Sequence, residues 1–270
     1  PELLPAIISI TLAHGAQQMA KRGVIVRRLN AIENFGSMDV LCTDKTDTLT
    51  EGVVRLDGAL DPEGQPSTAV LGSAYLNAQY QTGLTNALDD AIQAHAQKAG
   101  LKAGAEKKVD EIPYDFVRKR LSVVTANDAG ERAIVTKGAL DNILSICARA
   151  RVGDAFVPLD DARRADIEQR YSDWSGQGFR VLGIASKKIE ATTDSYTRDD
   201  ERDLAFIGFL LFFDPPKKDV RQTILDLATR GVQLKIITGD NQKVARHVAE
   251  AVELKIDGVL TGSELNDLRD

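Results

Sequence analysis

The chain has 270 residues, of which 43% are hydrophobic and 27% are charged, as is typical of a globular protein with one large or two ordinary domains. This composition excludes a disordered chain, and the formal net charge of −6 gives no general attraction to nucleic acid or anionic lipid. A phosphorylated ligand would therefore need local cations. Cys42 and Cys147 have apolar neighbours and no metal-binding spacing, so we expect both to be reduced and buried.

The first segment, Leu3–Ala13, is apolar over about eleven residues, fewer than the ~18 needed to cross a bilayer. We expect either a buried segment or the end of a longer membrane helix, and we assign residues 1–14 to such a stub. Two short apolar runs follow, Gly23–Val26 and Asp39–Thr43, which predict buried strands. The second run ends on a polar turn, Asp44–Thr50.

Residues 54–212 alternate helical with strand-like patterns, which predicts an α+β domain inserted into the first. The expected helices are Thr68–Tyr80, Asn86–Gln97, Leu140–Ala148 and Asp161–Gly176, and the expected strands are Leu121–Thr125, Ala133–Lys137, Arg180–Ser186 and Leu204–Phe213. We expect a turn-rich loop at Gly58–Ser67 and a solvated charge run at Arg198–Asp203.

The last part of the chain repeats a strand, polar turn and helix order. A helical pattern at Lys217–Thr229 precedes an apolar run at Val232–Ile237, which ends on Thr238–Asp240 before another helical pattern. This order favours an open, Rossmann-like α/β sheet with its chemistry at the carboxyl ends of the strands. We assign residues 15–53 and 213–270 to this domain.

The turn Asp44–Thr50 places a carboxylate directly after an apolar strand, followed by a lysine and three hydroxyl groups. Such a carboxylate can attack phosphorus to form an acyl phosphate, while Mg²⁺ and nearby donors neutralise the phosphoryl oxygens. The same residue types also cap helices well, so composition alone leaves both interpretations open.

The sequence of this turn, DKTDTLT, resembles the DKTGTLT phosphorylation signature of P-type ATPases at six of seven positions. The resemblance implies that ATP phosphorylates Asp44, with Asp44 and the backbone of Thr46 as Mg²⁺ ligands, and that Lys45 and Thr48 hold the phosphoryl group. It also implies a haloacid-dehalogenase-type phosphorylation domain, truncated at its C-terminus, with an inserted nucleotide-binding domain.

Further segments match the family in the same order. Thr238, Gly239 and Asp240 resemble the TGD motif, in which the first two residues grip the phosphoryl group and the aspartate lies near Mg²⁺. Asp214–Pro216 resembles the DPP hinge that leads back from the nucleotide-binding domain, although such a tripeptide is also an ordinary rigid turn.

The insertion contains candidates for an ATP site. Lys137 and Gly138 resemble the KGA motif, whose lysine lines the adenine pocket and whose glycine lets the ring approach the backbone. Phe116 offers an aromatic face and Arg118–Arg120 offers cations, unless Phe116 is a core residue beside a solvated basic cluster. Arg180 matches the family arginine that reaches the nucleotide phosphates.

The acidic residue that contacts the adenine amino group in the family has two possible counterparts, Asn86 and Asp89. At the other end of the chain, Pro1–Pro5 resembles the P-E-x-x-P motif of a membrane helix, which implies that Glu2 faces the transported cation. The neighbouring segments are most similar to the magnesium-transporting branch, although calcium pumps share this motif.

The chain resembles a fragment of that family, without the membrane domain, the actuator domain and the later Mg²⁺-binding segment. We expect the intact parent at the cytoplasmic face of the cell membrane, and nucleotide binding with little turnover from the fragment. Asp47 replaces the signature glycine. We expect its carboxylate to face the phosphoryl space, where charge repulsion at ~4 Å would cost up to about 4 kcal/mol.

Two alternatives remain open. One is a haloacid-dehalogenase-type phosphatase, which uses the same nucleophilic aspartate but needs a second acid two residues on, where this chain has Thr46. The other is a nucleotide-binding module that keeps Phe116, Lys137 and Arg180 while Asp47 silences the phosphorylation site.

Overall fold

A computed structural model describes residues 3–83, 86–101, 106–190 and 193–268 of the chain. The chain forms two compact units, each built from two segments. The first unit comprises Pro1–Thr43 and Arg221–Ile237, and the second comprises Asp44–Val220 and Thr238–Asp270.

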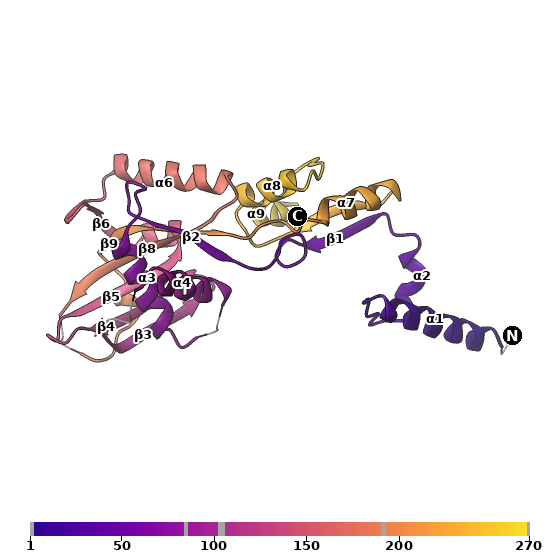
Figure 1. Cartoon of the computed structure of the whole chain (residues 1–270), viewed down its shortest axis with the longest axis horizontal. Coiled ribbons are helices and arrows are strands. Elements are labelled where there is room, and N and C mark those ends of the chain that lie inside the picture. Colours follow the sequence, from indigo (N-terminus) through magenta and orange to yellow (C-terminus); the bar gives the residue numbers. More distant parts are fainter. Residues whose placement is uncertain (1–2, 84–85, 102–105, 191–192, 269–270) are drawn as a thin grey trace. The chain divides into compact units, whose positions relative to one another are not determined.

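The second unit is built on an eight-stranded sheet (Figure 1). Its spatial order is β3-β4-β5-β8-β9-β6-β7, with β2 paired to β9. The pairs are antiparallel except that β6 runs parallel to β9. The strands are β2 (Arg55–Leu60), β3 (Lys107–Asp115), β4 (Arg120–Ala126), β5 (Arg132–Ala139), β6 (Cys147–Val152), β7 (Ala155–Pro158), β8 (Arg180–Ile189) and β9 (Leu204–Phe213).

Helices cover both faces of this sheet because its central strands are apolar on both sides. Helices α3 (Thr68–Tyr80) and α4 (Ala87–Lys98) supply one apolar cluster with strand residues such as Ile184. Helices α5 (Leu140–Leu144) and α6 (Asp161–Gly176) supply the other. The remaining helices of this unit are η1 (Arg198–Asp200), α8 (Gln242–Ala251) and α9 (Gly262–Asp267).

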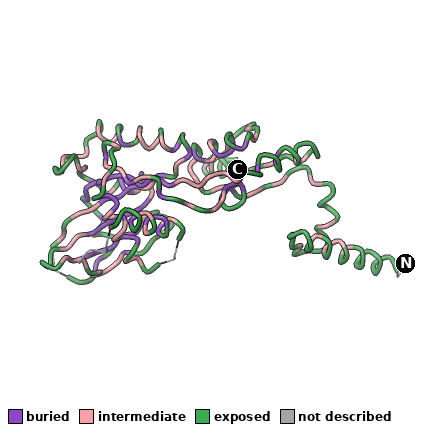
Figure 2. Tube along the Cα trace, viewed as in Figure 1, coloured by how far each residue is buried: buried purple, intermediate pink, exposed green. Residues whose placement is uncertain are grey.

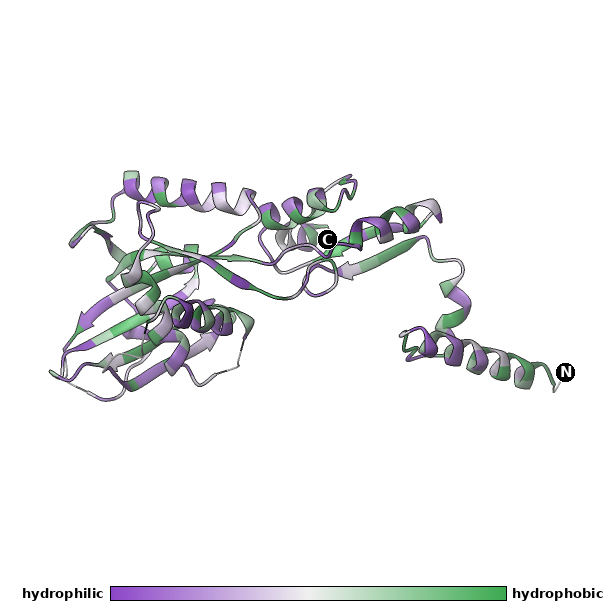
Figure 3. Cartoon of the chain, in the orientation of Figure 1, coloured by the Kyte–Doolittle hydropathy of each residue, from purple (hydrophilic) through white to green (hydrophobic). Residues whose placement is uncertain are grey.

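The first unit has little core of its own. It contains α1 (Leu3–Lys21), α2 (Ala31–Phe35), β1 (Val40–Asp44), β10 (Gln233–Ile237) and α7 (Val220–Thr229), which begins at the boundary. Strands β1 and β10 form a two-stranded sheet. Among the described residues of this unit, Ile224 alone is buried, and most of α1 and α2 is exposed (Figure 2). Hydrophobic residues lie along α1 and β1 (Figure 3), and some of them, such as Leu3 and Val40, are exposed. In the part of the chain that is described, no helix is long and apolar enough to span a membrane.

The structure corrects several expectations about local structure. The run Gly23–Val26 is not a strand, because Gly23 takes φ 82° in the turn after α1. The helix predicted at Leu140–Ala148 ends at Leu144, and β6 begins at Cys147. Residues 58–60 of the predicted loop Gly58–Ser67 belong to β2.

Burial also differs from expectation at two places. Cys42 is exposed while Cys147 is buried, because β1 belongs to a two-stranded sheet whose residues are half-buried at most. The run Arg198–Asp203 is not wholly solvated, because the side chain of Glu201 is completely buried.

Candidate functional site

The turn after β1 joins two of the predicted motifs. Asp44 is exposed, and its Oδ1 accepts a hydrogen bond of 2.7 Å from the backbone nitrogen of Lys45. The Lys45 side chain is buried, and its Nζ lies 2.8 Å from Asp240 Oδ2, with side-chain exposures of 6% and 11%. A buried ion pair is costly to break from one side, so it fixes the Asp240 turn beside the Asp44 turn.

The second oxygen of Asp240 faces another cation. Arg180 Nη1 lies 3.8 Å from Asp240 Oδ1, and the Arg180 side chain remains 55% exposed. The backbone nitrogen of Asp240 donates to Thr238 Oγ1 at 3.1 Å, which shapes the turn around Gly239. The structure therefore groups a carboxylate, a buried lysine and a half-exposed arginine at one place.

Three predicted polar residues of the first turn lie at its surface. Thr46, Asp47 and Thr48 are all exposed. Asp47 has φ 62°, a left-handed conformation that aspartate tolerates better than most residues. A Cβ placed on Gly52 would lie 2.6 Å from Asp47 Oδ1. The Asp47 carboxylate thus lies against the backbone of Gly52. The expectation that it faces the phosphoryl space stays a prediction.

Asp214 joins the two segments at the predicted boundaries of the inserted domain, residues 50–52 and 214–216, a contact that the sequence did not reveal. Thr50 Oγ1 donates to Asp214 Oδ2 at 2.6 Å, and the backbone nitrogen of Gly52 donates to Asp214 Oδ1 at 3.0 Å. Thr50 also forms a β-bridge with Pro216. These bonds hold the segment after the Asp44 turn against the predicted hinge.

The turn between β3 and β4 presents an aromatic side chain to solvent. Phe116 is 81% exposed and contacts Tyr114 edge-on at a ring centroid distance of 5.5 Å. Phe116 is therefore not a core residue. Arg118, in the same turn, donates to Asp115 and Glu201, so carboxylates already compensate its charge.

Lys137 lies on β5 with its side chain 5% exposed, and its Nζ forms an ion pair with Asp89. Asp89 Oδ2 also accepts bonds from Asn86 Nδ2 at 2.7 Å and Gln81 Nε2 at 3.1 Å. Burial lowers the pKa of Lys137, and the Asp89 carboxylate opposes this shift. Of the two candidates left open by the sequence, Asp89 is the one that contacts Lys137, while Asn86 caps α4.

Gly138 is required by packing inside the sheet. A Cβ at this position would lie 2.5 Å from both Lys119 O and Arg120 Cβ on the neighbouring strand. The close contact that requires a glycine at position 138 is thus with Lys119 and Arg120 of the same chain. The role that the resemblance gives Gly138 at the adenine ring stays a prediction.

The residues implied as Mg²⁺ ligands fit that ion in kind. The Asp44 carboxylate and the Thr46 carbonyl are hard oxygen donors, and Mg²⁺ usually takes one or two carboxylates together with water and phosphate. The described residues contain no group of three or more acidic, histidine or cysteine side chains placed to hold a metal ion. Glu2, implied as a transport residue, lies outside the described residues.

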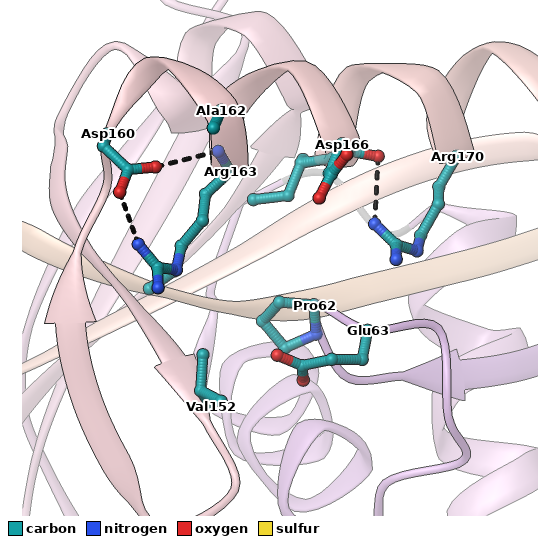
Figure 4. Close-up of a pocket in the computed structure, with 10 residues that line it drawn as sticks. Pro62, Glu63, Val152, Asp160, Ala162, Arg163, Asp166 and Arg170 are labelled. Atoms are coloured by element: carbon teal, nitrogen blue, oxygen red, sulfur yellow. Dashed lines mark hydrogen bonds and ion pairs between the residues drawn. The ribbon is translucent and has the colours of Figure 1, made fainter.

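A cavity of about 360 Å³ lies under α6, where it meets the β6–β7 hairpin and the 62–63 turn (Figure 4). Its arginines already have partners: Arg163 pairs with Asp160, and Arg170 donates to the Asp166 carbonyl. None of its lining residues belongs to the motifs described above. We therefore do not assign the candidate site to this cavity.

Comparison with known proteins identifies the family. Residues 66–219 match the family model described as P-type ATPase, cytoplasmic domain N. This match covers more than half of the chain, so the chain belongs to the P-type ATPase family.

Its curated relatives include transporters of two ions. "Magnesium-transporting ATPase, P-type 1" of Salmonella typhimurium strain LT2 and that of Escherichia coli strain K12 are each 42% identical over 272 residues. Both alignments cover all of this chain and 30% of the relative. The "Calcium-transporting ATPase" of Bacillus subtilis strain 168 is 28% identical over 309 residues, covering 99% of this chain and 35% of that protein. The chain thus spans about 30% of the length of the magnesium-transporting relatives.

Proposed function

We propose that this chain is the ATP-binding and aspartyl-phosphorylation portion of a P-type ATPase that couples ATP hydrolysis to cation transport, with Mg²⁺ as the cation. The buried Lys45–Asp240 ion pair supports this proposal most strongly, because it brings the turn of Asp44 together with the TGD turn. The magnesium-transporting relatives support the choice of ion. In the whole protein, a membrane domain and an actuator domain would be its partners, at the cytoplasmic face of the membrane.

Nucleotide binding and phosphoryl transfer are assigned to different parts of the chain. Residues 54–212 would bind the nucleotide through Phe116, Lys137 and Arg180. Residues 15–53 and 213–270 would form the haloacid-dehalogenase-type domain that accepts the phosphoryl group. Arg180 would connect nucleotide binding with phosphoryl transfer. Its guanidinium lies beside Asp240 and is half-exposed, so a phosphate of the nucleotide could still reach it.

In the proposed reaction an Asp44 carboxylate oxygen attacks the γ-phosphorus of ATP. A new bond forms between this oxygen and phosphorus, the bond from phosphorus to the β,γ-bridging oxygen breaks, and ADP leaves with that electron pair. Bound Mg²⁺ would neutralise charge on the phosphates. Lys45 and Thr48 would stabilise the equatorial oxygens, and the Lys45–Asp240 pair would keep the lysine oriented.

The phosphatase alternative is disfavoured by Thr46, which cannot serve as the second acid at that position. The silenced nucleotide-binding module is the stronger alternative, because Asp47 departs from the signature. The orientation of Asp47 against Gly52 argues for a tolerated substitution, because its carboxylate is directed to the backbone of that glycine.

Nucleotide binding is tested with Phe116→Ala in the 270-residue chain. We expect ATP binding to weaken by about 1–3 kcal/mol, the usual contribution of one stacked base. Phe156→Ala is the matched control, because Phe156 is also exposed, at 52%, and lies on β7. Isothermal titration calorimetry measures the ATP affinity of both variants. Unchanged affinity for Phe116→Ala would remove this residue from the site.

Phosphorylation is tested by replacing the corresponding segment of a full-length magnesium-transporting relative with this chain. We expect acid-stable incorporation of label from γ-labelled ATP, and none with Asp44→Asn, because an amide is not a nucleophile here. If Asp47 faces away from the phosphoryl group, Asp47→Gly changes the rate by less than about threefold. Absence of label in a folded chimera, with label restored by Asp47→Gly, would support the silenced module instead.

A further inference from the structure

The turn that follows η1 contains a carboxylate with no access to solvent. Glu201 has a side-chain exposure of 0%, although it belongs to a charged run that leads into β9. A buried charge is strongly unfavourable unless it is paired and hydrogen-bonded. The hydrogen-bond partners of Glu201 therefore show which residues this carboxylate holds in place.

All three partners come from β4 or from the turn before it. Glu201 Oε2 accepts from Arg118 Nη1 and from Arg120 Nε, the latter at 2.9 Å. Glu201 Oε1 accepts from Ser122 Oγ at 2.7 Å. The two arginine side chains are only 13% and 12% exposed, so Glu201 pairs with two largely buried cations, of which Arg118 also pairs with Asp115.

The turn between β3 and β4, residues 115–119, is held by hydrogen bonds at its base and is exposed to solvent at its tip. Asp115 Oδ1 accepts from the backbone nitrogens of Val117 and Arg118 at 2.7 and 2.9 Å, and the bond from Arg118 is the leading cause of a lowered Asp115 pKa. At the tip, Phe116 and Val117 are 81% and 87% exposed. The chain thus orders a turn whose aromatic side chain contributes little to its own core.

The network also reaches the strand of Lys137. Ser122 Oγ lies 2.7 Å from Thr136 Oγ1 on β5, directly before Lys137 in the sequence. Arg120 is the register partner of Gly138, whose missing side chain makes room for Arg120 Cβ. Glu201 is thereby connected to both elements of the candidate nucleotide site, although it is itself too deep to touch a ligand.

We propose that Glu201 is a positioning residue for adenine-nucleotide binding, which acts by holding Arg118 and Arg120 so that the 115–119 turn presents Phe116 in its binding orientation. This proposal rests on the proposed function. A turn ordered before the ligand arrives loses less conformational entropy on binding, so the network raises affinity without contacting the nucleotide.

The test is a double-mutant cycle in the 270-residue chain, with ATP affinity measured by calorimetry. We expect Glu201→Gln to weaken binding about tenfold, and to cost less than about twofold further when Phe116→Ala is already present. Glu201→Asp keeps the charge and should recover part of the affinity. Glu131→Gln is the control, because Glu131 is 59% exposed and its ion pair with Lys188 lies at the surface.

The fluorescence of Trp174, the single tryptophan, which packs against Phe209, reports whether each variant is folded. A chain that binds no ATP contradicts the proposed function itself. If Phe116→Ala weakens binding while folded Glu201→Gln does not, or if the two effects add, the positioning role is wrong. If Glu201→Gln does not fold, Glu201→Asp decides: about threefold weaker binding that disappears in the Phe116→Ala background supports the role, and unchanged affinity overturns it.

Discussion

The two units of this chain have similar kinds of strands but very different cores. Strand β9 of the second unit, Leu204–Phe213, is buried along nine of its ten residues. Strand β1 of the first unit, Val40–Asp44, has no buried residue. The second unit packs two apolar clusters against the two faces of its sheet. An apolar run is therefore a signal for a strand, whereas its burial depends on how many neighbours cover it.

The difference between the two cores bears on function, because the candidate nucleotide-binding residues and the strand that leads to the nucleophile lie in different units. Of the candidate nucleotide residues, Lys137 lies in the sheet with the large core, and Phe116 lies in a turn between two strands of that sheet. Asp44 lies at the end of β1, where the chain passes from the first unit into the second. We accordingly expect the nucleotide-binding part to be rigid on its own, and the strand that leads to the nucleophile to depend on further contacts.

The largest expected contrast between the units is in thiol reactivity. Burial raises the pKa of Cys147 from 9.0 to about 12, whereas Cys42 is exposed. Because the thiolate is the reactive species, a rise of about three pH units lowers its population about 1000-fold at pH 8. We expect a disulfide reagent to modify Cys42 at least about 1000-fold faster than Cys147.

Cys42→Ser should remove the fast phase, and denaturant should make the two thiols equally reactive. In the folded chain, the rate at Cys147 should still rise with pH above pH 9, since burial raises the pKa of its thiol to about 12. Equal rates for the two thiols in the folded chain would show that Cys42 and Cys147 are equally accessible to solvent, and would contradict the difference between the units.

A smaller contrast is expected from glycine substitutions. At Gly208, on β9 with φ 152°, a Cβ would lie 2.0 Å from Leu60 O and 2.7 Å from Val70 Cγ2. Gly208→Ala should lower the free energy of unfolding of the second unit by about 3 kcal/mol. Gly153, in the same unit, has φ 57° and no atom within 4 Å, so Gly153→Ala should cost only the ~1 kcal/mol of a left-handed backbone.

Gly231 provides the comparison in the first unit, with φ 78° and nothing within 4 Å of a Cβ. Urea unfolding followed by Trp174 fluorescence should shift for Gly208→Ala and stay unchanged for Gly231→Ala. A shift for Gly231→Ala as large as that for Gly153→Ala would mean that the two units unfold together.

The sequence predicted the central elements of the second unit well. Helix α3 and strand β9 begin and end at the predicted residues. Ser67 caps the start of α3, and β9 is a continuous apolar run that is followed by Asp214 and two prolines. Strand β2 was not predicted, and the start of β6 was predicted as the end of a helix. Strands β3 and β7 were missed as well. They lie at the two ends of the strand order, where exposed edges favour charged and polar residues and weaken the alternating pattern.

The candidate site was predictable where its residues follow strand ends. Lys45 and Asp240 belong to two such turns, and the structure pairs them. Glu201 was not predictable, because its partner Arg118 lies 83 positions earlier and the local sequence is typical of a solvated segment. The direction of the Asp47 side chain also depends on Gly52, a contact that no pattern within the signature contains.

Hydrogen exchange with and without ATP tests most directly whether the nucleotide binds to the turn and strands built on the large core. We expect β4, β5, β8 and β9 to be protected by the global stability of the second unit, and β1 and β10 to exchange near the rate of open segments. Added ATP should slow exchange of the Val117 and Lys119 amides and leave β10 unchanged. Protection by ATP confined to the first unit, or absent from the 115–119 turn in a chain that binds ATP, would contradict this account.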